Sequence, residues 1–187
     1  QNGVFEFWDK NELSFPVLQK LNISGLGSFI PSCINMFAKP NENKFVTLKD
    51  LTLRYASISD VQINTLVQAL PHLVNLDMAY NTESMEGDLI FSQLLDLQTL
   101  NLYSCKLTKF KHALQEKQVK LPRLSVINLG QTCCDEETVK LLIGYCSMLE
   151  YVGRQGCSSL VGVSLSIPEC NDYKTRGCVQ DEILYRL

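Results

Sequence analysis

Histidine and tryptophan are scarce in this sequence, and long apolar runs are missing. The 187 residues contain two histidines and one tryptophan. The longest apolar runs are far too short to span a bilayer, and no signal peptide is apparent. The formal net charge of −3 provides no basic field that could hold a phosphate backbone. The sequence therefore predicts neither a membrane span nor a nucleic-acid partner.

The residue patterns of common catalytic and metal sites are also missing. His72 follows a proline in a turn between elements, and His112 lies on an expected helix. Neither histidine has a cysteine or a carboxylate pair at the spacing of a metal site. The sequence has no phosphate-binding glycine loop and no GxSxG nucleophile turn. We therefore expect no enzyme activity, no metal and no cofactor.

Eight cysteines are present, but their spacing is irregular and no CxxC motif occurs. This density is below that of small disulfide scaffolds, which favours buried thiols in a reducing compartment. We therefore expect an intracellular protein of the cytoplasm or nucleus. The triplet Asn22-Ile23-Ser24 is a glycosylation sequon, so a secreted protein with disulfide-bonded ends is the alternative.

A six-residue pattern, LxxLxL with other aliphatic residues allowed, recurs along the chain. Its starting residues are 30, 25, 24 and 27 positions apart, which is the period of leucine-rich repeats. A sixth unit begins at Leu149 but places Arg154 where an aliphatic residue belongs, and Leu160-Val163-Leu165 competes with it. The final repeat is therefore expected to be either irregular or a short strand pair that closes the solenoid. The five regular matches are Leu18-Leu21-Ile23, Leu48-Leu51-Leu53, Leu73-Leu76-Met78, Leu97-Leu100-Leu102 and Leu124-Ile127-Leu129.

The pattern predicts an α/β leucine-rich repeat solenoid of about five to six repeats. Alternation of aliphatic and polar residues indicates a short strand in each repeat, and the strands add up to a parallel, concave sheet. Residues 59–73 and 135–149 have the caps and apolar stripes of helices, which would cover the convex side. The expected organisation is an N-terminal cap at 1–17, the repeats at 18–165 and a C-terminal cap or tail at 166–187.

The polar residues between the strand aliphatics are expected to point to the concave face. Tyrosine and arginine commonly anchor protein interfaces because they combine large contact areas with directed hydrogen bonds. A solvated sheet face with aromatic residues for cross-strand packing is the alternative interpretation. The predicted binding patch consists of Arg54, Tyr55, Asp77, Tyr80, Asn101 and Tyr103.

Cys133 and Cys134 are adjacent, which raises the question of a reactive pair. In the repeat register Cys134 takes the place that Ile58 and Leu107 occupy in other repeats. We expect Cys134 to point into the core and Cys133 to face outward. Neighbouring residues of an extended turn point to opposite sides, so a joint metal site is not expected.

The pattern LxxLxL, together with Asn81, Cys105 and Thr132 at the ninth repeat position, resembles leucine-rich repeats of the ribonuclease-inhibitor-like, cysteine-containing type. Residues 114–153 are similar to late repeats of the Zyg and Zer family, substrate receptors of cullin-2 ubiquitin ligases. The similarity lies in Leu121-Pro122, Leu124, Gly130, Asp135, Val139, Met148, Val152 and Gly153, in that order.

This resemblance implies a non-catalytic protein–protein interaction module within a substrate receptor of a cullin-RING ubiquitin ligase. Elongin and cullin would then bind through segments outside this chain, and another protein would occupy the concave face. Two alternatives remain open at this point: a secreted or cell-surface recognition domain, and a structural scaffold within a larger protein.

Overall fold

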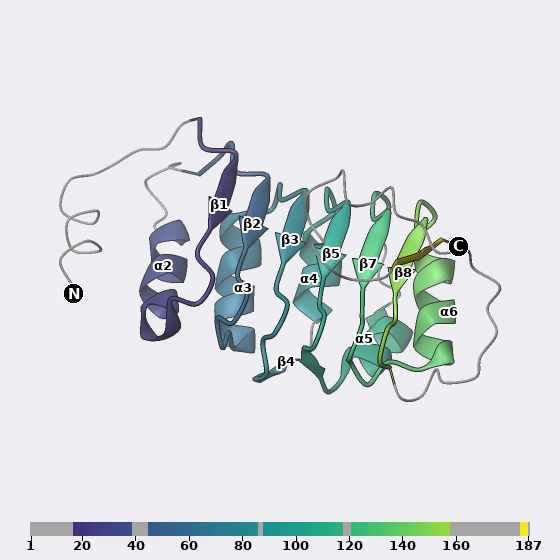
Figure 1. The fold of residues 1–187 in the computed structure, drawn as a ribbon. Coiled ribbons are helices and arrows are strands. Elements are labelled where there is room, and N and C mark those ends of the chain that lie inside the picture. The colour runs from purple at the N-terminus through teal and green to yellow at the C-terminus, as the bar shows by residue number, and fades with distance from the viewer. Residues whose placement is uncertain (1–16, 39–44, 86–87, 118–120, 158–183, 187) are drawn as a thin grey trace.

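The computed structural model describes residues 17–38, 45–85, 88–117, 121–157 and 184–186. In this part of the chain, seven strands form one sheet in the order β1-β2-β3-β5-β7-β8-β9. The strands stand side by side, and the helices form a second layer against one face (Figure 1). The strands are β1 (Lys20–Asn22), β2 (Asp50–Thr52), β3 (Asn75–Asp77), β5 (Thr99–Asn101), β7 (Val126–Asn128), β8 (Tyr151–Gly153) and β9 (Leu184–Arg186).

Six of these strands are parallel and share one register. The middle residue of each strand pairs with the middle residue of the next, so that Leu51, Leu76, Leu100, Ile127 and Val152 form one buried row. This row is the second aliphatic position of the LxxLxL pattern. The pattern therefore located these strands and their register correctly, including the weaker unit that begins at Leu149.

The helical layer connects successive strands, and each helix contacts the next one along the chain. Helix α3 begins with a capping box in which Ser59 and Gln62 satisfy each other's backbone groups. Asp135 is the N-terminal cap of helix α6, and its side chain accepts a hydrogen bond from the amide of Thr138. The helices are η1 (Gly27–Phe29), α2 (Ile30–Phe37), α3 (Asp60–Ala69), α4 (Asp88–Gln93), α5 (Phe110–Lys117) and α6 (Glu136–Tyr145).

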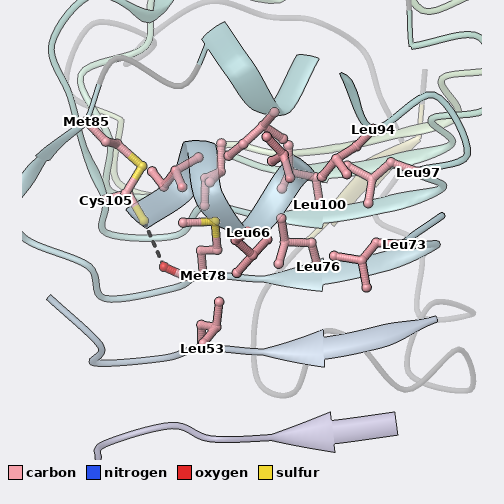
Figure 2. Packing of buried hydrophobic residues seen from close by; sticks show 14 of the residues in the cluster. Leu53, Leu66, Leu73, Leu76, Met78, Met85, Leu94, Leu97, Leu100 and Cys105 are labelled. Carbon is pink, nitrogen blue, oxygen red and sulfur yellow. Dashed lines mark hydrogen bonds between the residues drawn. The ribbon is translucent and has the colours of Figure 1, made fainter. Parts of the chain in front are cut away.

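The core lies between the sheet and the helices. Leu66 of α3 faces the strand residues Leu76 and Leu100, and Met78 continues this layer beyond the end of its strand (Figure 2). All four side chains are almost completely buried. Full burial of a side chain of this kind contributes about 1.5–3 kcal/mol to the free energy of unfolding, so the aligned rows of the shared register stabilise the fold.

A second column of side chains fixes the turns that follow the strands. Asn81 accepts hydrogen bonds from the amides of Ala56 and Ile58 and donates to the carbonyls of Leu53 and Met78. The equivalent residues in later units also donate to the carbonyl of the last aliphatic residue of an LxxLxL unit. Cys105 donates its thiol hydrogen to Met78 O (Figure 2), and Thr132 and Cys157 each donate to Leu129 O.

The predicted fold class is corrected by this arrangement. A regular solenoid would repeat one strand–helix unit along its whole length with all strands parallel. Here β9 pairs antiparallel with β8, and β4 (Ser84–Met85) and β6 (Lys106–Leu107) form a separate two-stranded sheet. The connections also differ, from a 3-10 helix joined to α2 to the six-residue α4. The structure is an α/β fold with one mostly parallel sheet and helices on one face, not a regular leucine-rich repeat solenoid.

Other expectations from the sequence have mixed outcomes. The apolar stripe expected in residues 59–73 is buried at Ile63, Leu66 and Val67 of α3 and at Leu70, which caps its end, whereas Ile143 in the stripe expected in residues 135–149 is exposed. The proposed caps at 1–17 and 166–187 fall almost entirely outside the described residues, as does the competing unit at Leu160-Val163-Leu165. No helix in the described ranges is long and apolar enough to cross a membrane.

Candidate functional site

The candidate site lies on the face of the sheet opposite the helices, which we call the strand face. The last residue of most parallel strands closes a small turn there, because its side-chain oxygen accepts a hydrogen bond from the amide two residues later. These bonds join Asn22 to Ser24, Asp77 to Ala79, Asn101 to Tyr103 and Asn128 to Gly130, at 2.9–3.1 Å. In β2 the residue is Thr52, and Ser24 Oγ instead accepts from the amide of Arg54.

Three residues beyond these turn-closing residues, the backbone is left-handed in each unit. In all of these units except the last, the amide of the left-handed residue donates to a carbonyl of the next unit, as in Tyr55 N to Ala79 O and Tyr80 N to Tyr103 O. A side chain in this conformation costs about 1–2 kcal/mol relative to glycine. The left-handed row consists of Gly25 (φ 68°), Tyr55 (53°), Tyr80 (62°), Ser104 (54°), Gln131 (51°) and Gly156 (73°).

Tyr55 and Tyr80 place two aromatic rings in the left-handed row. Their rings stack with centroids 4.5 Å apart and an angle of 3° between the planes. Tyr80 also meets Tyr103 edge to face at 5.4 Å. The ring of Tyr103 lies over Gly130, where an added Cβ atom would come within 2.6 Å of it. The three rings form a continuous aromatic row across β2, β3 and β5 that ends on a glycine of the next unit.

Arg54 and Asp77 form an ion pair beside the aromatic row. The guanidinium donates through Nε and Nη2 to the same carboxylate oxygen, at 2.8 and 2.7 Å. The other oxygen of Asp77 is used by the amide of Ala79. Because both side chains are mostly shielded from solvent, the guanidinium is held in one position and does not sample many rotamers.

The structure divides the six predicted patch residues into exposed and buried ones. Tyr55 is 58% exposed, and Arg54 and Tyr80 are half-buried. Asp77, Asn101 and Tyr103 are buried, with exposed fractions of 5%, 0% and 9%. Asp77 and Asn101 lie on the strand face, as expected, but their burial and that of Tyr103 keep all three out of the exposed part of the predicted patch. Asp77 and Asn101 close turns, and Tyr103 packs against its neighbours.

The strand face accordingly has two halves. In the open half, β1 to β3, Asp77 is buried, but the other residues are exposed or half-buried: Lys20, Asn22, Asp50, Thr52 and Asn75. In the closed half, β5, β7 and β8, its residues are buried: Thr99, Asn101, Val126, Asn128 and Tyr151. The candidate site is the part of the open half nearest the strand ends, with Arg54, Tyr55 and Tyr80 at its centre.

The sequence contains a signal for the left-handed row that lies outside the LxxLxL pattern. Gly25 and Gly156 occupy the row's first and last positions, and glycine is the usual residue at positive φ. Aligning these glycines with Tyr55 and Tyr80 would have predicted that the two tyrosines are conformationally strained. Strain of this kind is often kept at functional sites.

A separate pocket of about 330 Å³ lies between the starts of α5 and α6. Lys111 on its wall bonds Asp135 at 2.8 Å and also pairs with Glu137. The bond from Lys111, followed by those from Thr138, lowers the pKa of Asp135 to about 2. The same two acidic partners raise the pKa of Lys111. These charges are engaged with one another, and they tie α5 to the cap of α6.

Cys133 and Cys134 line this pocket in different ways. Cys133 is exposed and donates its thiol hydrogen to Leu107 O at 3.1 Å. Cys134 is buried, and burial raises the pKa of its thiol to about 12. The predicted division into one core residue and one surface thiol is confirmed. Within the described part of the chain, no group of three or more histidine, cysteine or acidic residues is arranged to hold a metal ion.

Comparisons with known proteins do not assign this chain to a family. No family model and no curated protein matches it. A chain in the structure of the Chaetomium Mex67:Mtr2 subunits is similar, with 17% identity and a TM-score of 0.45, over 75% of this chain and 98% of that one. These values are too low to assign a fold, a partner or a function. The comparisons also give no support to the leucine-rich repeat assignment.

Proposed function

We propose that this chain is a non-catalytic protein-interaction module and that its partner docks on the open half of the strand face. The observation that carries the proposal is the stacked pair of Tyr55 and Tyr80 in left-handed backbone, with Tyr55 largely exposed. The core does not require these rings, because glycine, serine and glutamine occupy the same position in other units. A strained, exposed aromatic pair supports a role in recognition.

The ion pair beside the rings supports the same proposal. Arg54 is already oriented by Asp77, so a partner that contacts it pays little additional side-chain entropy. A rigid guanidinium next to a flat aromatic surface resembles the anchor residues of many interfaces. The partner is another protein, and neither nucleic acid nor a membrane is part of the proposal.

The test is binding by a variant that loses both rings but retains the backbone. Asparagine tolerates left-handed backbone better than most residues, so we choose Tyr55→Asn/Tyr80→Asn. The matched control is Val61→Ala, which trims an exposed apolar residue, 76% exposed, on α3 in the helical layer. A partner is first identified by affinity capture from cell extract and mass spectrometry, and its Kd is then measured with each purified chain.

We expect the double variant to weaken binding at least tenfold, a loss of about 1.4 kcal/mol, and Val61→Ala to leave Kd unchanged. Circular dichroism must show the same fold in all chains. An unchanged Kd in the folded double variant would show that the partner does not dock on this surface.

An intracellular location and a place in a ubiquitin-ligase receptor are finer parts of the proposal. The six described cysteines are free thiols, and five of them are buried, which supports a reducing compartment. Thiol counting on native protein from an oxidising host should find eight free thiols; fewer would favour the secreted alternative. Purified elongin and cullin should join the complex only when segments outside this chain are supplied.

A further inference from the structure

Two buried amide groups in the closed half of the strand face have no hydrogen-bond partner for their nitrogen atoms. They belong to Asn101 and Asn128, whose exposed fractions are 0% and 1%. A buried donor without a partner is costly, and most such groups in proteins bind a protein group or an ordered water molecule. Two of them on neighbouring strands therefore call for a common explanation.

The orientation of both amides is fixed by their other atom. Oδ1 of Asn101 accepts from the amide of Tyr103 at 3.1 Å, and Oδ1 of Asn128 accepts from Gly130 at 2.9 Å. Exchanging O and N in either side chain would place two N–H donors against each other. The Nδ2 groups must therefore point away from the turns, and exchanging the two atoms does not remove the problem.

The two donors are also neighbours. Asn101 and Asn128 are direct partners in the register of β5 and β7. Neighbouring strands lie roughly 4.8 Å apart, and an N–H···O bond spans about 2.9 Å. One oxygen atom placed between the side chains can therefore accept a hydrogen bond from both.

The charges around the two asparagines indicate whether this oxygen belongs to an anion or to a neutral water molecule. Both donors are neutral amides, and the next residue in the row is Asp77, which pairs with Asn101 in the register. A carboxylate at this position would repel an anion, whereas a water molecule carries no charge and can use its own hydrogens for other acceptors. We infer that Asn101 and Asn128 form a binding site for one internal water molecule that bridges β5 and β7.

This water has a structural consequence for the aromatic row. The two asparagines close the turns that carry Tyr103 and Gly130, and the ring of Tyr103 lies over Gly130. A molecule bound to both amides holds these turns relative to each other. It thereby fixes the end of the row against which Tyr80 packs.

The test is nuclear magnetic resonance of the asparagine side-chain amides in the full chain. The signals are assigned through their own side-chain carbons, so that assignment needs no variant. We expect both Nδ2 groups to show rotating-frame Overhauser cross-peaks to the water signal, with the sign opposite to that of hydrogen exchange. Asn22 closes the same kind of turn but is exposed, so its amide should show no peak from a long-lived water.

Two further measurements separate water from other occupants. Titration with sodium acetate should leave both amide signals in place, because the site rejects anions. In Asn128→Asp the turn oxygen is kept, as in Asp77, and a water molecule can donate to the new carboxylate; the Asn101 cross-peak should therefore persist. Absence of the cross-peaks in the wild-type chain, or a saturable shift with acetate, would overturn the inference.

Discussion

The open and closed halves of the strand face are built on the same strand register but have different surfaces. In the open half, charged and polar residues of β1 to β3 accompany two strained tyrosines. In the closed half, threonine, valine and asparagine side chains are buried, and the left-handed row contains serine and glutamine. The comparison shows that the position of a residue in the register determines its direction, whereas its exposure depends on what packs around it.

The largest expected difference between the halves is the loss of stability when the middle leucine of a strand is replaced by alanine. Leu100 is fully buried in β5, and Leu21 is the half-buried equivalent on the edge strand β1. We expect Leu100→Ala to lower the free energy of unfolding by about 2–5 kcal/mol and Leu21→Ala by less than half of that. Urea denaturation followed by circular dichroism measures both. Equal losses would mean that the two halves do not differ in packing.

A smaller contrast concerns two aspartates within the open half. Asp77→Asn keeps the turn acceptor but breaks the shielded pair with Arg54, so we expect a loss of about 1–3 kcal/mol. Asp50 pairs with Lys20, whose side chain is 80% exposed, and Asp50→Asn should cost less than about 1 kcal/mol. Denaturation at low and high salt distinguishes them, because only the Asp50 pair should be strongly screened. A similar loss of stability in both variants would show that Asp77 does not hold Arg54 in a shielded ion pair.

The caps of α3 and α6 predict different responses to acid. The pKa of Asp135 in the folded chain, about 2, lies below its ordinary value of 3.8. The ionised carboxylate therefore contributes its full stabilisation of the fold above pH 3.8, and this stabilisation is lost as the pH falls through about 2. Wild type should exceed Asp135→Asn in stability by under about 1 kcal/mol near neutral pH, and the difference should shrink as the pH falls from about 4 towards 2.

The cap of α3 provides the matched control for this experiment. It is the uncharged capping box of Ser59 and Gln62. Ser59→Ala should therefore destabilise the chain by about 1 kcal/mol to the same extent at every pH at which the chain folds. Thermal unfolding across this range measures both differences. A difference between wild type and Asp135→Asn that does not change with pH would contradict the role of Lys111 and Asp135.

The smallest expected effect lies in the left-handed row. Ser104→Gly relieves backbone strain without removing an aromatic contact, and we expect it to stabilise the chain by about 0.5 kcal/mol after the greater entropy of unfolded glycine is included. Tyr80→Gly relieves the same strain but loses the contacts with Tyr55 and Tyr103, so it should not stabilise. Thermal unfolding compares the two, and a gain in Tyr80→Gly would show that the aromatic row contributes little.

The sequence predicted the parallel strands well because their signal is local and repeated. Each LxxLxL unit contains its own buried aliphatic residues, and the spacing between units left room for the connecting helices. The regularity of the fold was predicted wrongly, since the antiparallel pairing of β9 with β8 joins segments without a shared pattern. The separate β4–β6 sheet likewise depends on contacts between two-residue segments that no periodicity reveals.

The candidate site was predicted only in part, for a related physical reason. Alternation gave the correct direction for Arg54, and the residue types drew attention to Tyr55 and Tyr80. The alternation of aliphatic and polar residues could not show that Asp77 and Asn101 use their side-chain oxygens to close turns. That role depends on the conformation of the backbone beyond each strand. The burial of Tyr103 is likewise a property of its neighbours, among them Gly130 in the next unit.

The antiparallel pairing of β9 with β8 also gives the sheet a direction of growth. A duplicated strand–helix segment could join the sheet beside β1, where the parallel register and the helical layer would simply continue. Beside β9 the same segment would not continue the parallel register, because the chain of β9 runs the opposite way. Among the described strands, the sheet therefore has one parallel edge and one antiparallel edge, and the open half with its tyrosines lies next to the parallel one.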